Sequence, residues 1–256
     1  MTAATSSAPW VSTSEQPLVG DHAIRADSPI RGQQTLRVRS LQVDGGRIER
    51  WAAGFGERHG AATAERGADR ITLTAADGCS AVLHLPFPHG PADVEDPVDG
   101  SAEAAAHVVS TNALAPRTVL ALLVRRGGYG CAVIENGVLT ASKAGTRHVQ
   151  GKTAAGGWSQ QRFSRRRDGQ TDVLVNAAAD VATRILLPVR RPDVLVTGGD
   201  RPLLERVLSD PRLKPVAGLP QGPHLGVGDP RSRMLHTLPQ LIRAVRIDLH
   251  EIGPRH

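Results

Sequence analysis

Two adjacent glutamines follow a pair of glycines in the segment GGWSQQRFSRRR, which runs from Gly156 to Arg167. Neighbouring glycines permit positive φ angles and let the backbone approach a ligand closely. The carboxamides of Gln160 and Gln161 donate and accept hydrogen bonds but do not titrate, so they are poor general bases. The chemistry that suits them is the orientation of a water molecule beside a reactive group.

The same segment closes a window from Asn136 to Arg167 that contains no acidic residue. The formal net charge of the chain is +6, and acidic and basic residues nearly balance outside the window, so the basicity is local. On a helix, Arg162, Arg165 and Arg166 form one stripe, which holds phosphates by counterion release without reading base sequence. Loop, carboxamides and stripe together predict hydrolysis at the end of an RNA. The cations of the window are Lys143, Arg147, Lys152, Arg162, Arg165, Arg166 and Arg167.

The elements around the loop predict a mixed α/β sheet. The continuous apolar run from Thr118 to Val124 is typical of a central strand, and Asn136-Gly137 is a strong hairpin signal. After the loop, apolar residues at helical spacing predict one long helix that ends near Leu187. The other predicted elements are strands over 130–135, 138–142, 193–197 and 244–249, a strand extension over 146–150, and helices over 201–209 and 231–243.

The N-terminal part of the chain predicts a small strand–helix–strand–strand unit. Its strands are expected from Thr35, over 70–75 and over 80–85, and its helix over 47–60, with Ile48, Trp51, Ala52 and Phe55 on one face. We therefore expect a disordered tail over 1–16, a small α/β domain over 17–90 and a linker over 91–115, which could hold a short helix near its end. A catalytic domain over 116–256 follows and includes the C-terminal helix and strand.

This order of hairpin, basic strand, glycine loop and arginine-rich helix resembles the middle domain of eukaryotic and archaeal release factor one. In that family a GGQ motif precedes an RFxRxR helix. Aligning Arg162 to Arg167 on RFxRxR puts Trp158 at the family's glutamine position, and glutamine follows two residues later in Gly157-Trp158-Ser159-Gln160. The shifted pattern resembles the Vms-like release-factor branch, in its short actinobacterial form. The resemblance covers residues 118–208 and implies a release-factor GGQ-like (RNase H-like) catalytic domain.

The resemblance also implies an activity and a site. Members of the Vms-like branch release stalled nascent chains from peptidyl-tRNA during ribosome quality control. Carried over, Gln160 is the catalytic glutamine, Gln161 is a candidate for the same role, and Gly156 and Gly157 form the hinge. The partners implied are the large ribosomal subunit and peptidyl-tRNA, with no cofactor and no metal. The residues expected to face RNA are Trp158, Arg162, Arg165, Arg166, Lys152 and Arg147.

Other functions stay open or are disfavoured. The glutamine could instead direct a ribose hydroxyl onto the neighbouring phosphodiester, which would trim the 3′ end of the tRNA. The displaced glutamine also leaves a non-catalytic ribosome- or tRNA-binding factor as an alternative. A two-metal nuclease needs clustered carboxylates, and the acid-free window argues against it. An aromatic content of 3% argues against binding of single strands on a row of stacking residues.

Several local patterns receive plain structural interpretations. Cys79 and Cys131 read as buried thiols, and Gly127-Gly128 as a hairpin turn. Gly198-Gly199-Asp200 reads as a strand-to-helix connection in which Asp200 caps the helix. His84 and His89 lack a third metal ligand. With no long apolar run and no signal-peptide core, we expect a cytoplasmic protein that does not bind a membrane.

Overall fold

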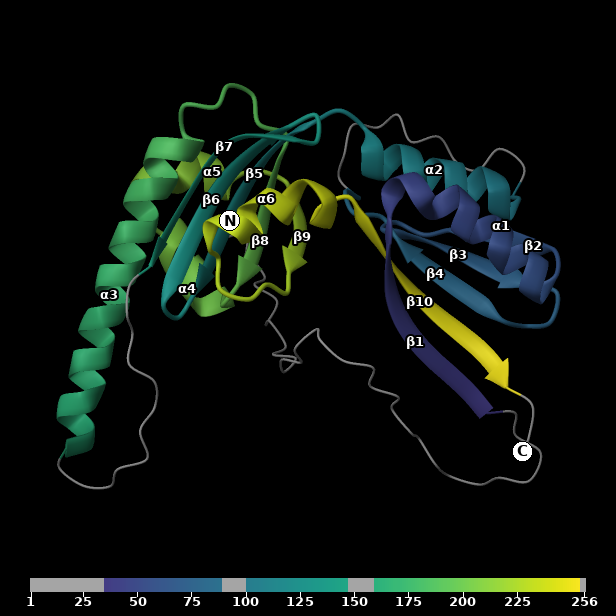
Figure 1. Cartoon of the computed structure of the whole chain (residues 1–256), viewed down its shortest axis with the longest axis horizontal. Coiled ribbons are helices and arrows are strands. Elements are labelled where there is room, and N and C mark those ends of the chain that lie inside the picture. Colours follow the sequence, from purple (N-terminus) through teal and green to yellow (C-terminus); the bar gives the residue numbers. More distant parts are fainter. Residues whose placement is uncertain (1–34, 89–99, 147–158, 254–256) are drawn as a thin grey trace, which may run out of the picture.

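The computed structural model describes residues 35–88, 100–146 and 159–253, with the backbone alone over 35–36 and 159–168 and at 253. These residues form two five-stranded sheets with helices packed against them (Figure 1). The mixed α/β class expected from the sequence is confirmed. How the chain divides into domains stays a prediction, and its N-terminal tail lies outside the described residues.

The first sheet is antiparallel, and helices cover one of its faces (Figure 1). Helix α1 contributes Ile48, Ala52 and Phe55, which are all buried against the sheet, as the spacing predicts. In sheet order the strands are β1 (Thr35–Asp44), β10 (Ala244–Gly253), β4 (Ser80–His84), β3 (Arg70–Ala75) and β2 (Ala62–Arg66). The covering helices are α1 (Ile48–His59), which follows the short turn η1 (Gly45–Arg47), and α2 (Ala102–Leu114).

Strand β10, at the C-terminal end of the chain, is an inner strand of this first sheet. It pairs with β1 along its whole length, from Ala244 opposite Asp44 to Gly253 opposite Thr35, and with β4 on its other side. Its buried side chains Val245, Ile247 and Leu249 belong to the core under α1 and α2. The C-terminal strand therefore completes the sheet that the N-terminal strands begin.

Helix α2 lies in the second half of the linker expected over residues 91–115, where the sequence allows a short helix. From Ala102 this segment is a 13-residue helix, capped by the Ser101 hydroxyl, which accepts a hydrogen bond from the Ala104 amide. Ala105, Ala106 and Val109 are buried against the first sheet. The alanine-rich composition reads as a linker, but small side chains also let a helix pack closely. Residues 89–99 lie outside the described residues.

The second sheet is mixed: β5, β8 and β9 run parallel, whereas β5, β6 and β7 are antiparallel neighbours. In sheet order its strands are β7 (Val138–Thr146), β6 (Gly128–Glu135), β5 (Thr118–Arg125), β8 (Val194–Gly199) and β9 (Gln221–Leu225). The packed helices are α3 (Ser159–Leu186), α4 (Arg201–Leu208), α5 (Lys214–Ala217), which follows the turn η2 (Pro211–Leu213), and α6 (Ser232–Leu241).

Strand β5 is buried on both faces, which explains its uninterrupted apolar sequence. Leu120 and Leu122 face the core formed with α3, α4 and α5. Val119, Ala121 and Leu123 face the core formed with α6. The central position expected for this strand is confirmed, and it holds helices on both sides of the sheet.

The hairpin between β6 and β7 is also confirmed. Asn136 and Gly137 both have positive φ, 53° and 81°, which is the backbone of a type I′ turn. Strands β2 and β9 and the short helix α5 are not among the predicted elements. β9 has the sequence QGPHL, and its glycine and proline read as loop signals. As an edge strand it can accept a proline.

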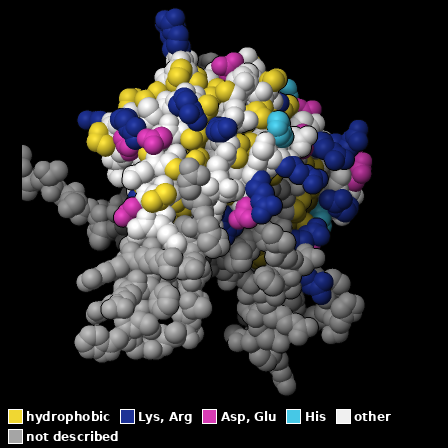
Figure 2. Space-filling model, turned by 60° about the vertical axis from the view of Figure 1, so that its left-hand side comes forward, with side chains coloured by type: hydrophobic (Ala, Val, Ile, Leu, Met, Phe, Trp, Pro, Cys, Tyr) yellow, Lys and Arg dark blue, Asp and Glu magenta, His cyan; other side chains and the backbone are white. Residues whose placement is uncertain are grey.

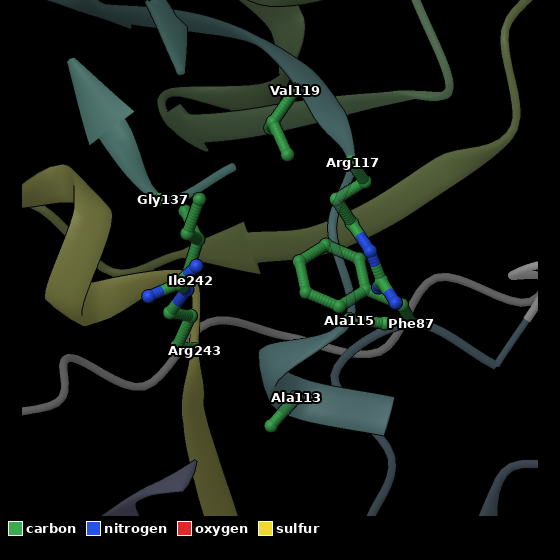
Figure 3. A pocket seen from close by; sticks show the side chains of 8 residues that line it. All are labelled: Phe87, Ala113, Ala115, Arg117, Val119, Gly137, Ile242 and Arg243. Carbon is green, nitrogen blue, oxygen red and sulfur yellow. The ribbon is translucent and has the colours of Figure 1, made fainter. Parts of the chain in front are cut away.

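Figure 3 shows the junction at which the chain passes between the two sheets. Arg117 is 8% exposed, and its Nη2 donates a hydrogen bond of 2.9 Å to the carbonyl oxygen of Asn112. The Asn112 side chain bonds both the amide and the carbonyl of Phe87. Burial lowers the pKa of Arg117, and the nearby Arg243 lowers it further, whereas Asp193 raises it. The cavity between these side chains is about 10 Å³, enough for one water molecule.

Both cysteines are buried and unpaired, as expected. Burial raises the pKa of the Cys131 thiol to about 12, and burial also raises that of Cys79. Neither thiol is therefore ionised at neutral pH. None of the helices in the described ranges is both long enough and apolar enough to traverse a bilayer.

Candidate functional site

Helix α3 starts at Ser159, so the backbone of Gln160 and Gln161 lies in its first turn. The amide groups of a first helical turn have no partner within the helix, and they give this end a partial positive charge. No acidic residue lies in the turn to offset that charge. Arg162, Arg165 and Arg166 follow on the same continuous helix, so the spacing expected for a basic stripe is present in the backbone.

The remaining predicted site residues lie outside the described residues. They are Arg147, Lys152, Gly156, Gly157 and Trp158, which belong to the segment between β7 and α3. The same holds for His148. The structure therefore gives the two ends of the predicted loop, Thr146 at the end of β7 and Ser159 at the start of α3.

The C-terminal part of α3 is firmly packed, whereas its earlier turns extend past the sheet (Figure 1). Leu174 and Ala178 are fully buried, and Leu186 is 1% exposed, all in the core formed with β5 and β6. By contrast Gly169 is exposed and Val173 is 55% exposed. The predicted helix face is confirmed, and it anchors the helix from Leu174 onward.

Two ion pairs connect α3 to the elements beside it. Asp172 pairs with Arg206 on α4, and Asp180 pairs with Arg212 of η2 at 2.9 Å. All four side chains are about half exposed, so each pair adds at most about 1 kcal/mol. The buried face of the helix therefore contributes more to its anchoring than these ion pairs do.

Strand β7 delivers the chain to the loop in a fixed register. Gly145 lies opposite Tyr129 of β6, and Thr146 lies opposite Gly128. The ring of Tyr129 covers Gly145 so closely that a Cβ atom there would lie 2.3 Å from the ring carbon Cζ. Tyr129 is 4% exposed and shares the core of α3. Tyr129 therefore connects the end of β7 to the core in which the later turns of α3 are packed.

Charge on the described surface is mixed. On the face in Figure 2, Lys and Arg side chains have Asp and Glu side chains among them. Lys143, the one window cation whose side chain is described, is exposed on β7. The excess of positive charge is thus a property of the window and not of this whole face.

One group of described residues has donor atoms that could hold a metal ion. The donor atoms of His59, Asp77 and Cys79 all lie within 4.8 Å of one another. These donors already have partners: His59 Nδ1 lies 2.9 Å from the Asp77 carboxylate, which also accepts a hydrogen bond from the Cys79 amide. These hydrogen bonds stabilise the β3–β4 turn and explain why the three residues lie together.

His84 takes part in a different cluster. Its Nε2 lies 2.8 Å from the Asp248 carboxylate and 3.2 Å from Nη2 of Arg246. His89, considered with it in the sequence, lies outside the described residues. His84 is thus a member of a hydrogen-bonded group on the first sheet.

The segment after β8 is a strand-to-helix connection capped by Asp200, as the sequence predicts. The Asp200 side chain accepts a hydrogen bond from the Leu203 amide and caps α4. Gly199 has a φ of 96°, and a Cβ atom there would lie 2.2 Å from the carbonyl oxygen of Val124. Close packing on β5 therefore explains the glycine without a ligand.

The structure also forms a pocket that the sequence does not predict. Its lining residues come from 126–128, 146 and 229–231, and its volume is about 360 Å³. Because the contributing segments are about a hundred residues apart, no local motif marks it. The pocket begins where β7 ends, beside the predicted loop.

Comparison with curated proteins finds no match. A family model described as the Actinobacteria/chloroflexi VLRF1 release factor matches residues 117–248, more than half of the chain. The match contains β5, the hairpin, the predicted loop, α3 and the first half of β10. Release factors act in translation and interact with the ribosome. The chain therefore belongs to the Actinobacteria/chloroflexi VLRF1 release factor family.

Proposed function

We propose that this protein is a peptidyl-tRNA hydrolase that acts on the large ribosomal subunit and releases stalled nascent chains. The observation that carries the proposal is the start of α3 at Ser159. Gln160 and Gln161 belong to the first turn of this helix, whereas its buried side chains begin at Leu174. At a rise of 1.5 Å per residue, Gln160 lies ~20 Å along the helix from Leu174. Such an arm suits a site deep inside a larger particle.

In the proposed reaction Gln160 orients a water molecule beside the ester that joins the peptide to the tRNA. The water oxygen bonds to the ester carbonyl carbon, and the bond between that carbon and the ribose oxygen breaks. One proton of the water ends on the ribose oxygen, which leaves a free hydroxyl on the tRNA. A carboxamide that neither gains nor loses a proton can direct this attack but cannot drive it alone. Most of the barrier lowering is therefore expected from the ribosomal site.

The residues around the glutamine have supporting roles in the proposal. Gly156 and Gly157 give the loop the freedom to approach the tRNA end, and Trp158 stacks on a base or ribose. Cations on the loop and helix contact the phosphates of tRNA or ribosomal RNA. They are Arg147, Lys152, Arg162, Arg165 and Arg166. Because its proposed substrate is on the ribosome, the expected compartment is the cytoplasm.

The displaced glutamine favours one alternative. Relative to a GGQ motif it arrives two residues late, which is compatible with a loop that clamps RNA without chemistry. In that case the protein is a non-catalytic ribosome- or tRNA-binding factor. A third route retains catalysis but attacks the phosphodiester next to the ester through a ribose hydroxyl, and it yields a shortened tRNA.

The test is release of a labelled nascent chain from peptidyl-tRNA on isolated large ribosomal subunits. Wild type is compared with Gln160→Ala, with Gln161→Ala and with Gln42→Ala, an exposed glutamine of β1 that serves as the matched control. The 3′ end of the freed tRNA is sequenced in the same samples, and binding to the subunits is measured separately.

Release by wild type and the Gln42→Ala control, lost in Gln160→Ala with binding retained, is the expected result. An intact CCA end then indicates ester hydrolysis, and a shortened end indicates cleavage of the tRNA. Release that survives in both loop variants contradicts the proposed role of glutamine. Tight binding by wild type without release supports the non-catalytic factor.

A further inference from the structure

A second site is suggested by the pocket of about 360 Å³ beside the end of β7. It lies beyond the carboxyl ends of two parallel strands: Arg126 directly follows β5, and Asp229 to Arg231 come shortly after β9. The carboxyl ends of parallel strands are the usual place for ligands in sheets of this kind. The volume is within the range of pockets that hold small ligand groups.

The walls of the pocket are fixed by packing. Pro230 lies against the backbone of β6, where Cβ atoms at Gly128 and Gly130 would approach its ring to 3.6 and 3.4 Å. Arg125 Nη1 donates a hydrogen bond of 2.7 Å to the carbonyl oxygen of Val227. These contacts hold the segment after β9 against the β5–β6 hairpin, so the cavity does not depend on a loose loop.

The charge of the pocket favours an anion. Arg126 is exposed and makes no ion pair with any described residue. Arg231 faces Asp229 at 3.5 Å, but the two side chains are 76% and 62% exposed, so this pair is weak. Two guanidinium groups against one carboxylate leave the pocket with a net positive charge. Guanidinium groups are well suited to phosphate because they offer paired N–H donors.

The position of the pocket connects it to the predicted loop. Thr146, the last residue of β7, lines the pocket and lies opposite Gly128 in the sheet. Helix α3 begins beyond this same end of the second sheet and runs back along it (Figure 1). An RNA strand that ran from the start of α3 back along the helix would reach this end of the sheet, where Arg126 lies.

We infer that this pocket binds a backbone phosphate of RNA and fixes the tRNA or ribosomal RNA beside the loop. The inference rests on the proposed function, because that function brings RNA to this end of the sheet. Arg126 and Arg231 contact the phosphate, and Asp229 weakens the interaction by repulsion. The contact adds affinity without sequence preference, as expected for a phosphate contact.

The test is binding of fluorescently labelled, deacylated tRNA to the full-length protein over a series of salt concentrations. Arg126→Gln and Arg231→Gln should each lower affinity severalfold and reduce the slope of log K against log salt by about 1. Asp229→Asn should raise affinity. Arg50→Gln is the matched control, because Arg50 is an exposed residue of α1, far from the pocket in the sequence, and its substitution changes the net charge equally.

Opposite effects of Arg126→Gln and Asp229→Asn support the inference, because a loss of folding cannot raise affinity. Equal effects of Arg126→Gln and Arg50→Gln would overturn it, since only the overall charge would then matter. Inorganic phosphate is also tested as a competitor at constant ionic strength. If it competes as effectively as the phosphates of unlabelled tRNA, the inference is overturned and the pocket is a site for free phosphate.

The two proposals fail in different measurements. The pocket is tested by binding alone, and Gln160→Ala should bind tRNA as wild type does. If Gln160→Ala still releases nascent chains while the pocket variants change affinity, the proposed chemistry is wrong and the RNA site stands. If release depends on Gln160 but the pocket variants bind tRNA normally, the proposed RNA site is wrong and the proposed chemistry stands.

Discussion

The guanidinium carbon of Arg117 lies over the ring of Phe87, 3.9 Å from the ring centroid, where the chain crosses between the two sheets. Because Arg117 is buried, this cation–π contact should contribute more than an exposed one. In a double-mutant cycle of Arg117→Met and Phe87→Leu, we expect a coupling energy of about 1–2 kcal/mol. Urea unfolding measures it, and additive effects of the two substitutions would mean that ring and guanidinium do not interact.

Tyr129 and Gly145 form a cross-strand pair in which only glycine fits. Gly145→Ala should destabilise the protein by about 1–3 kcal/mol, because the new methyl group overlaps the ring. The cost should fall when Tyr129→Leu is already present, since the aromatic ring that causes the overlap is gone. Unfolding midpoints of the four variants test this, and an equal cost in both backgrounds would contradict it.

Gly169 lies on the part of α3 that extends past the sheet, and a Cβ atom there would meet nothing within 4 Å. Gly169→Ala should therefore stabilise the helix by about 0.5–1 kcal/mol. Gly56→Ala in α1 is the matched control, since that position is equally open. Circular dichroism during thermal unfolding gives both values. A gain at Gly56 without one at Gly169 would argue against a continuous helix before Leu174.

Asp248 gives a pH dependence with a defined direction. Burial raises the pKa of this carboxyl, but hydrogen bonds from Ser40, Arg246 and His84 outweigh burial and lower the pKa to about 2. The folded-state pKa is thus below the ordinary value of 3.8, so the stabilisation is complete above about pH 4 and is lost as the pH falls toward 2.

The comparison that tests this is the free energy of unfolding of wild type and Asp248→Asn between pH 2 and pH 7. Wild type should be more stable at neutral pH, and the difference should shrink as the pH approaches 2. A difference that stays constant across this range would show that the charge of Asp248 does not contribute.

Local patterns were enough to predict most elements of the second sheet. The apolar run of β5, the Asn136-Gly137 turn and the helical spacing from Leu174 each reflect a rule that acts within a few residues. The arginines are expected on a helix, whereas Gln160 and Gln161 are expected in the loop before it; the structure puts the backbone of both glutamines in the first turn of α3. Their roles stay predictions, because these roles depend on side chains that reach outside the described parts of the chain.

The pairing of strands that are distant in the sequence could not be predicted from local patterns. Strand β10 alternates like any half-buried strand, and nothing in its residues indicates that its neighbours are β1 and β4. The burial of helix α2 could not be predicted either, because its alanine-rich sequence is compatible with a linker and with a packed helix. The pocket around Arg126 could not be predicted because three of its seven lining residues, at 229–231, are far away in the sequence.

The position of β10 has a consequence for how the protein is made. Among the described strands β1 pairs with β10 alone, and β10 follows all five strands of the second sheet in the chain. Domains that fold during synthesis need all their strands outside the ribosome. This release factor can therefore join β1 to the rest of its first sheet only after all five strands of the second sheet have been synthesised.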